Sequence, residues 1–140
     1  MAVTHQHSDF DIDFNVNAFV DDLATVKDRA AIRQSLMNIL LTMPGEKPFN
    51  KSFGVGMHQL LFELFTPLEM AKWEQDAEWA IKRLEPRVIV NRVSLFDDVY
   101  NPGDDLDANL VTMTINYSII AGNESNPIED SLTVRLTKVR

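Results

Sequence analysis

Apolar side chains recur at helical spacing in two stretches of the chain. The first stretch places them every three or four residues, at Ile32, Leu36, Ile39, Leu40 and Met43. The second stretch does the same, at Met70, Trp73, Ala77, Ile81 and Leu84. Such a stripe buries one face of a helix. The sequence therefore predicts two amphipathic helices, ended by Pro44-Gly45 and by Pro86, because proline lacks an amide N–H and disfavours a helical residue before it.

The two helices differ in how clearly their starts are marked. Before the second helix, Thr66 can cap the N-terminus, Pro67 suits the first helical position, and Glu69 lies three residues after the cap. This is a capping box combined with a proline whose φ already fits a helix. Before the first helix, Thr25 or Asp28 can act as the cap.

A short apolar run (57–64) and a loop separate the two helices. The loop is rich in proline, glycine and phenylalanine, at Pro44, Gly45, Pro48, Phe49, Phe53 and Gly54. Proline and glycine fix the path of a turn, and a flexible linker would not need two phenylalanines. We therefore expect an ordered loop of structural weight, held against the core by Phe49 and Phe53.

From Val88 onward the apolar period changes from 3.6 to 2 residues, which indicates β-strands. The predicted strands are 88–96, 110–120 and 132–139, with turn residues between them. They would form an antiparallel meander of three or four strands with the helices on one face. Near the start of the chain, residues 10–16 can form an extended segment with one apolar face. The predicted fold class is α+β, with two main helices and a short one packed on the meander.

The composition excludes several classes of protein. A chain of 140 residues fits one domain, and we expect residues 1–9 to be a flexible polar arm and 10–140 the domain. The absence of cysteine excludes a disulfide scaffold and a thiolate metal site. A formal net charge of −8 opposes nucleic-acid binding. No apolar run approaches the ~20 residues of a membrane span, and no secretion signal is recognisable at the N-terminus.

The candidate chemical groups do not assemble into a recognisable active site. Glycoside hydrolysis needs two opposed carboxyl groups, one of them in an apolar pocket. Glu63 lies in an amphipathic segment, and Glu85 has Arg87 two residues on, which would lower its pKa. His58 lies on an apolar-rich turn that favours a structural role. Irregular spacing favours a solvated loop over a calcium site for Asp97, Asp98, Asp104, Asp105 and Asp107. We predict no catalytic residue, cofactor or metal site.

Two features suit a partner better than a reaction. Glu85, Pro86 and Arg87 leave the second helix just before the sheet, where the charges could pair internally and brace the joint or form part of an interface, for which arginine is suited. The first and last predicted strands are both candidate sheet edges, and exposed edges invite strand addition. The last strand could accept an added strand, although its basic side chains could also discourage pairing. Its candidate residues are Leu132, Val134, Arg135, Leu136 and Lys138.

Four segments in register resemble one family. They are residues 31–63 (AIRQSLMNILLTMPGEKPF…FGVGMHQLLFE), 8–14 (SDFDIDF), 66–68 (TPL) and 84–87 (LEPR). Together they resemble the phage baseplate wedge family, the sheath-initiating proteins of contractile tails, and its counterpart in type VI secretion baseplates. The resemblance covers nearly the whole chain, and Glu85-Pro86-Arg87 is its most specific part.

The resemblance implies a structural adaptor without catalytic activity. It implies that Glu85, Pro86 and Arg87 dock on the core helical bundle of the wedge, and that the sheet accepts strands from tail-sheath subunits. The implied partners are other baseplate wedge proteins, the tail-sheath protein and tail-tube-proximal baseplate proteins, in a virion tail baseplate assembled in the host bacterial cytoplasm. Three alternatives stay open: the equivalent type VI secretion subunit, a muramidase-like lysozyme, and a regulatory protein that binds another protein's adaptor.

Overall fold

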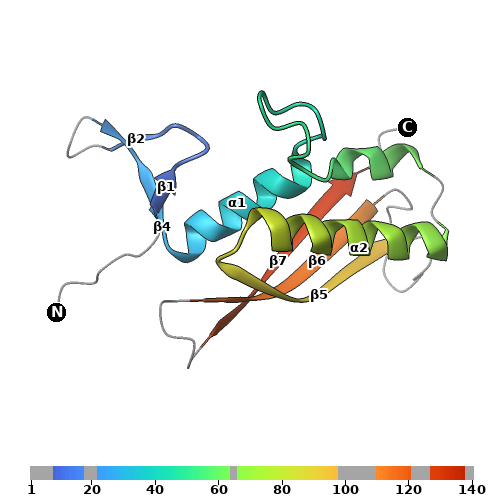
Figure 1. Cartoon of the computed structure of the whole chain (residues 1–140). Coiled ribbons are helices and arrows are strands. Elements are labelled where there is room, and N and C mark those ends of the chain that lie inside the picture. The colour runs from blue at the N-terminus through green and yellow to red at the C-terminus, as the bar shows by residue number, and fades with distance from the viewer. Residues whose placement is uncertain (1–7, 18–21, 64–65, 98–109, 121–126, 138–140) are drawn as a thin grey trace.

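A three-stranded antiparallel sheet and the helices packed on it form the body of the protein (Figure 1). The computed structural model describes residues 8–17, 22–63, 66–97, 110–120 and 127–137. Along the chain, α1 (Arg29–Leu41), the 3-10 helix η1 (Met57–Phe62) and α2 (Pro67–Leu84) precede β5 (Val88–Asp97), β6 (Leu110–Ile119) and β7 (Ile128–Thr137). The sheet order β5-β6-β7 confirms the predicted meander and the α+β fold class.

The core lies between the helices and one face of the sheet. The predicted stripe of α1 is buried through Ile32, Leu36, Ile39 and Leu40, and that of α2 through Ala77 and Ile81. On β6 the alternate residues from Val111 to Ile119 are buried. Burying an aliphatic or aromatic side chain of this size stabilises the fold by roughly 1.5–3 kcal/mol. The two hydrophobic periods of the sequence therefore meet in one core.

The helix boundaries follow the local signals with one difference. Thr66 caps α2 as predicted, since its Oγ1 accepts a hydrogen bond from the Glu69 N–H at 3.3 Å, and Pro67 is the first helical residue. The first helix ends at Leu41, and Met43 is 42% exposed instead of lying on the buried stripe. The physical reason is Pro44, which disfavours a helical conformation at the residue before it.

At the start of α1, Asp28 occupies the N-cap position with φ 49°. Of the two predicted positions, Asp28 is thus the N-cap residue. Its side chain, however, makes no capping hydrogen bond to the helix. The last strand begins at Ile128, earlier than the predicted 132, and its predicted end at 138–139 lies outside the described residues.

Of the two phenylalanines in the loop between α1 and η1, Phe53 packs on the core and Phe49 does not. Phe53 packs on the core and lies under the Lys47 ammonium, which is 3.9 Å from the ring centre. The prediction that Phe49 anchors the loop is wrong, because its side chain is fully exposed at a φ of 62°. Gly54 explains the tight end of the loop: its φ is +93°, and a Cβ there would lie 2.1 Å from the Thr42 carbonyl oxygen.

Two short strand pairs form a separate N-terminal ribbon. β1 (Ser8–Phe10) pairs with β4 (Thr25–Lys27), and β2 (Val16–Asn17) pairs with β3 (Asp22–Leu23), both antiparallel. The expectation of one continuous extended segment over 10–16 is wrong, because a turn interrupts it. Of the predicted arm 1–9, only Ser8 and Asp9 fall within the described residues, where they begin β1.

Candidate functional site

The corner between α2 and β5 contains the first set of predicted contact residues. Glu85 is the C-cap residue of α2, and Arg87 directly precedes β5. The Arg87 guanidinium donates from Nε to Glu85 Oε1 and from Nη2 to Glu85 Oε2, both at 2.5 Å. From α1, the Ser35 hydroxyl donates to the same Oε2 at 2.6 Å. One carboxylate therefore ties both helices to the first strand of the sheet.

Burial and hydrogen bonding act in opposite directions on Glu85. Its side chain is 3% exposed, whereas that of Arg87 is 30% exposed. Burial by itself would raise the pKa of Glu85, but the hydrogen bonds from Arg87 and Ser35, together with the charge of Arg87, hold the pKa below its ordinary value. The hydrogen bond to Glu85 in turn raises the pKa of Arg87. The pair is therefore ionised and fixed at this corner.

The internal ion pair that the sequence left as one alternative is thus present. Because Glu85 is buried, a partner at this corner could touch only the exposed Pro86 and the exposed part of Arg87. Ser35 was not predicted as a site residue. The one feature of the sequence that could have indicated it is its position beside the buried stripe of α1. Its role depends on Glu85, fifty residues away in the chain.

The free side of β7 is the second candidate site. The Ser131 N–H donates to Asp130 Oδ1 at 2.9 Å, and the Ser131 carbonyl accepts from Arg33 Nη2 at 2.7 Å, so the backbone of Ser131 faces away from β6. Every second residue of a strand shares this orientation. Among the described residues β7 pairs only with β6. The outer edge beyond the Arg33 contact is therefore formed by Thr133, Arg135 and Thr137.

The predicted strand-addition residues divide into two groups. Arg135 is exposed and directs its backbone groups to the outer edge. Leu132 and Val134 are buried in the core and direct theirs to β6, as does the half-buried Leu136. Lys138 lies outside the described residues. The three apolar residues shape the sheet, and Arg135 is the predicted residue placed to meet an added strand.

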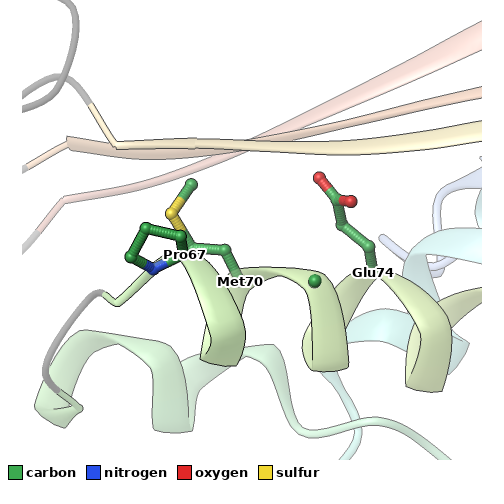
Figure 2. Close-up of a pocket in the computed structure, with 4 residues that line it drawn as sticks. Pro67, Met70 and Glu74 are labelled. Carbon is green, nitrogen blue, oxygen red and sulfur yellow. The ribbon is translucent and has the colours of Figure 1, made fainter.

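The opposite edge of the sheet, β5, is occupied by a helix side chain. The Leu95 N–H donates to Glu74 Oε1 of α2 at 2.7 Å, and α2 packs chiefly on β5. Figure 2 shows Met70 and Glu74 pointing from α2 toward the sheet, beside a cavity of about 330 Å³ lined by Pro67, Met70, Ala71 and Glu74. An incoming strand would have to displace Glu74 at β5, so the two edges are not equivalent.

Asp130 anchors the start of β7 and was not found from the sequence. Tyr117 Oη donates to Asp130 Oδ2 at 3.2 Å, and Arg29 Nη2 lies 3.2 Å from Oδ1. Burial would raise the pKa of Asp130, but a backbone N–H, Arg29 and Tyr117 lower it below its ordinary value. A signal did exist, because Asp130 is in phase with Leu132 on the core-facing side of the strand.

The candidate catalytic side chains Glu63 and His58 lie in exposed positions. Glu63 and Asp76 both line a cavity of about 320 Å³ beside Trp73, and Trp73 Nε1 donates to Glu63 Oε2 at 2.8 Å. Glu63 is exposed, so it lacks the apolar enclosure that a general acid of a glycosidase needs. His58 is exposed on η1.

Within the described ranges, no three histidine, aspartate or glutamate side chains gather as they would around a metal ion. The predicted acidic loop lies outside those ranges, apart from Asp97 at the end of β5. In the same ranges, no helix has the length and hydropathy to cross a membrane.

A family model described as "Baseplate wedge protein gp25" matches residues 26–124, more than half of the chain. The chain belongs to the baseplate wedge protein gp25 family. A curated relative, the baseplate wedge protein gp25 of Enterobacteria phage T4, is 37% identical over 71 residues. That match spans 49% of this chain and 54% of the phage protein, about half of either.

Solved structures share the fold of this gp25-family protein. A candidate tail lysozyme from Geobacter sulfurreducens superposes with a TM-score of 0.62 at 22% identity, over 84% of this chain and 98% of that one. A chain of the anti-feeding prophage baseplate has a TM-score of 0.59 at 18% identity, over 96% and 87%. A chain of the type VI secretion baseplate complex has a TM-score of 0.57 at 12% identity, over 79% and 93%.

Family membership relates the protein to baseplate wedge proteins of the gp25 type. At these identities the likeness to the candidate tail lysozyme concerns the fold alone.

Proposed function

We propose that this gp25-family protein is a structural adaptor in the baseplate of a contractile phage tail. It docks on the core helical bundle of the wedge through the α2–β5 corner and templates the first ring of tail-sheath subunits by accepting strands at the edge of β7. The observation that carries the proposal is the difference between the two sheet edges. Glu74 of α2 accepts a hydrogen bond from the edge backbone of β5, whereas in the described part of the chain no strand pairs with the outer edge of β7 beyond Ser131.

The corner suits docking because it is rigid before any partner arrives. Arg87 is held in one orientation by two hydrogen bonds to Glu85, so little conformational entropy is lost when its exposed edge meets a neighbour. Glu85 acts in this proposal as a positioning residue.

The β7 edge suits strand addition because its outward residues carry polar side chains on the solvent face while the strand stays anchored in the core. The Arg33 guanidinium donates a hydrogen bond to the Ser131 carbonyl, so the part of the edge that can accept a strand begins after Ser131. Main-chain hydrogen bonds would supply affinity, and alternate side chains would supply specificity.

The phage tail is the preferred setting. The curated relative that the chain matches is a phage protein at 37% identity, whereas the type VI secretion baseplate supports only a shared fold at 12%. In this setting the protein takes its place in the virion tail baseplate, assembled in the host bacterial cytoplasm. Its partners are other wedge proteins, the tail-sheath protein and baseplate proteins next to the tail tube.

The docking half is tested with Arg87→Lys, which keeps the charge but loses the bidentate fork. The matched control is Ser35→Ala, which weakens the same internal network without altering the exposed surface. We expect both variants to lose comparable thermal stability, and only Arg87→Lys to lose co-purification with co-expressed wedge-core proteins. A folded Arg87→Ala protein that still joins the wedge would contradict docking through this corner.

The strand-addition half is tested with Thr133→Pro. Proline there removes an N–H that faces away from β6, so it blocks an added strand while the β6–β7 ladder keeps its bonds. Thr133→Ala is the control, because it changes the same side chain and leaves the edge N–H intact. We expect Thr133→Pro baseplates to initiate few sheaths in vitro, as counted by electron microscopy, and Thr133→Ala baseplates to retain initiation. Normal sheath growth on folded Thr133→Pro would refute the edge assignment.

A further inference from the structure

The first arm of the N-terminal ribbon contains a three-residue bulge. The Asp11 N–H donates to the Ala24 carbonyl at 3.0 Å, and the Ala24 N–H donates to the Asn15 carbonyl at 2.7 Å. Asp11 and Asn15 therefore bond to the same residue of the opposite arm, and residues 12–14 are looped out of the ladder. Such bulges redirect side chains away from a sheet.

Asp11 holds the bulge in shape. Its carbonyl accepts the Phe14 N–H at 3.0 Å, Oδ1 accepts the Asp13 N–H at 3.2 Å, and Oδ2 accepts the Asn15 amide at 2.9 Å. Phe14 has a φ of 50°, a conformation that costs energy for a bulky residue and persists only where its surroundings impose it. Hydrogen bonds from Asn15 and Asp13 also lower the pKa of Asp11, so the carboxylate that holds the turn is ionised.

A side chain of α1 links the bulge to the body. Gln34 Nε2 donates to the Phe10 carbonyl at 2.6 Å, and Gln34 Oε1 accepts the Ile12 N–H at 3.2 Å. In Figure 1 the ribbon projects from the start of α1, away from the three-stranded sheet. The bulge is thus presented in a fixed direction relative to the core.

What the ribbon presents is apolar. Phe10, Ile12, Phe14 and Val16 are 59%, 55%, 68% and 65% exposed. A two-stranded ribbon has no hydrophobic core of its own in which these four side chains could be buried. Exposed apolar groups concentrated in one small element are typical of a protein interaction site.

Charge identifies the chemistry of the partner. Residues 8–17 contain Asp9, Asp11 and Asp13 and no basic residue. A second copy of the ribbon would bring like charges together, whereas a basic surface would complement them. The match to the family model begins at residue 26, after the bulge.

We infer that residues 10–16 form a docking knob for a neighbouring baseplate protein with an apolar pocket rimmed by lysine or arginine. Ile12 and Phe14 enter the pocket, and Asp13 meets its rim. The charge of Asp9 acts on Arg87 of the same molecule, so Asp9 is not assigned to the rim. The inference rests on the placement of the protein in a baseplate, and residues 10–16 belong neither to the Arg87 corner nor to the β7 edge.

The experiment measures binding of the full chain to a purified wedge complex assembled without it, by biolayer interferometry. Ile12→Ser/Phe14→Ser removes the apolar knob. Phe49→Ser is the control, because Phe49 is an exposed phenylalanine in a loop and, like Phe14, has a positive φ. We expect the double variant to melt at the wild-type temperature and to bind about tenfold or more weakly. Phe49→Ser should bind as wild type does.

A charge variant gives a second, independent measurement. Asp13→Lys should weaken binding, and raising the salt concentration should weaken wild-type binding more than that of Asp13→Lys. Unchanged affinity of the folded double variant would overturn the inference, and so would an equal loss with Phe49→Ser. A wild-type dimer that the double variant abolishes would overturn it as well, because the knob would then serve a second copy.

The binding data distinguish a wrong assignment of the docking knob from a wrong proposed function. If Arg87→Lys abolishes binding and the double variant does not, the knob is wrong and the docking corner stands. If the double variant abolishes binding while Arg87→Lys and Thr133→Pro have no effect, the knob stands and the proposed function is wrong.

Discussion

Replacement of Arg87 by alanine removes both donors that hold the buried Glu85 carboxylate. The variant keeps two partners of this carboxylate, the Ser35 hydroxyl at 2.6 Å and the backbone N–H of residue 87. The Glu85 side chain, 3% exposed, cannot turn to solvent without opening the joint between α2 and β5. A substitution that leaves a buried carboxylate without its cation is one of the few single-site changes expected to lower the free energy of unfolding strongly.

The size of this effect follows from the contacts that are lost. A hydrogen bond to a charged group contributes about 1.5–3 kcal/mol, and Arg87 makes two of them. Arg87 is 30% exposed, so solvent already offsets part of this gain. We expect the free energy of unfolding to fall by ~3 kcal/mol at pH 7. A domain with an unfolding free energy of about 5–15 kcal/mol would remain folded.

The pH dependence should change sign. In the wild type the pKa of Glu85 is lower in the folded than in the unfolded state. The contribution of the pair is therefore complete above the unfolded value, about 4.3, and is lost as the pH falls through the folded value. In Arg87→Ala, burial without the cation should raise the folded pKa above the unfolded one. The Glu85 contribution to stability should then increase as the pH is lowered from 7 toward 5.

Urea unfolding followed by tryptophan fluorescence at pH 7, 6 and 5 measures both effects. Arg83→Ala is the control, because Arg83 is an exposed arginine whose hydrogen bond within the described ranges goes to the Ser52 carbonyl. It should lose less than about 1 kcal/mol and keep the wild-type pH dependence. The reasoning is refuted if Arg87→Ala loses no more than the control, or if its stability falls with pH in parallel with the wild type.

Two further predictions concern local geometry. Gly54→Ala should lose at least ~2 kcal/mol of unfolding free energy, because φ is +93° and the new methyl group would lie 2.1 Å from the Thr42 carbonyl oxygen. Gly45→Ala, with the same φ and nothing within 4 Å, should lose only ~1 kcal/mol, and equal losses would contradict the clash. Thr66→Ala should lose ~1 kcal/mol, because the Glu69 N–H loses its cap; an unchanged melting temperature in calorimetry would contradict this role.

The sequence determined the elements whose signals are local. The stripe from Ile32 to Leu40, the start of α2 at Thr66-Pro67 and the alternation along β6 each depend on neighbours within a few residues. Spacing and capping chemistry therefore specified them, and the structure confirms them. The meander followed as well, because alternating strands joined by short connections pair antiparallel.

Tertiary structure decided how the candidate sites are used. Glu85 and Arg87 could pair or face a partner, and the arrival of Ser35 from α1 fixed them as a buried pair. The sequence does not distinguish the two edges of the sheet. In the structure, Glu74 bonds to the edge backbone of β5 at Leu95, and Arg33 bonds to that of β7 at Ser131. Phe49 matched the pattern of an anchor but lies in solvent, and residues 12–14 leave the ladder because both flanking residues bond to Ala24. Spacing along the chain specifies period and caps, whereas burial and edge exposure depend on residues that only folding brings together.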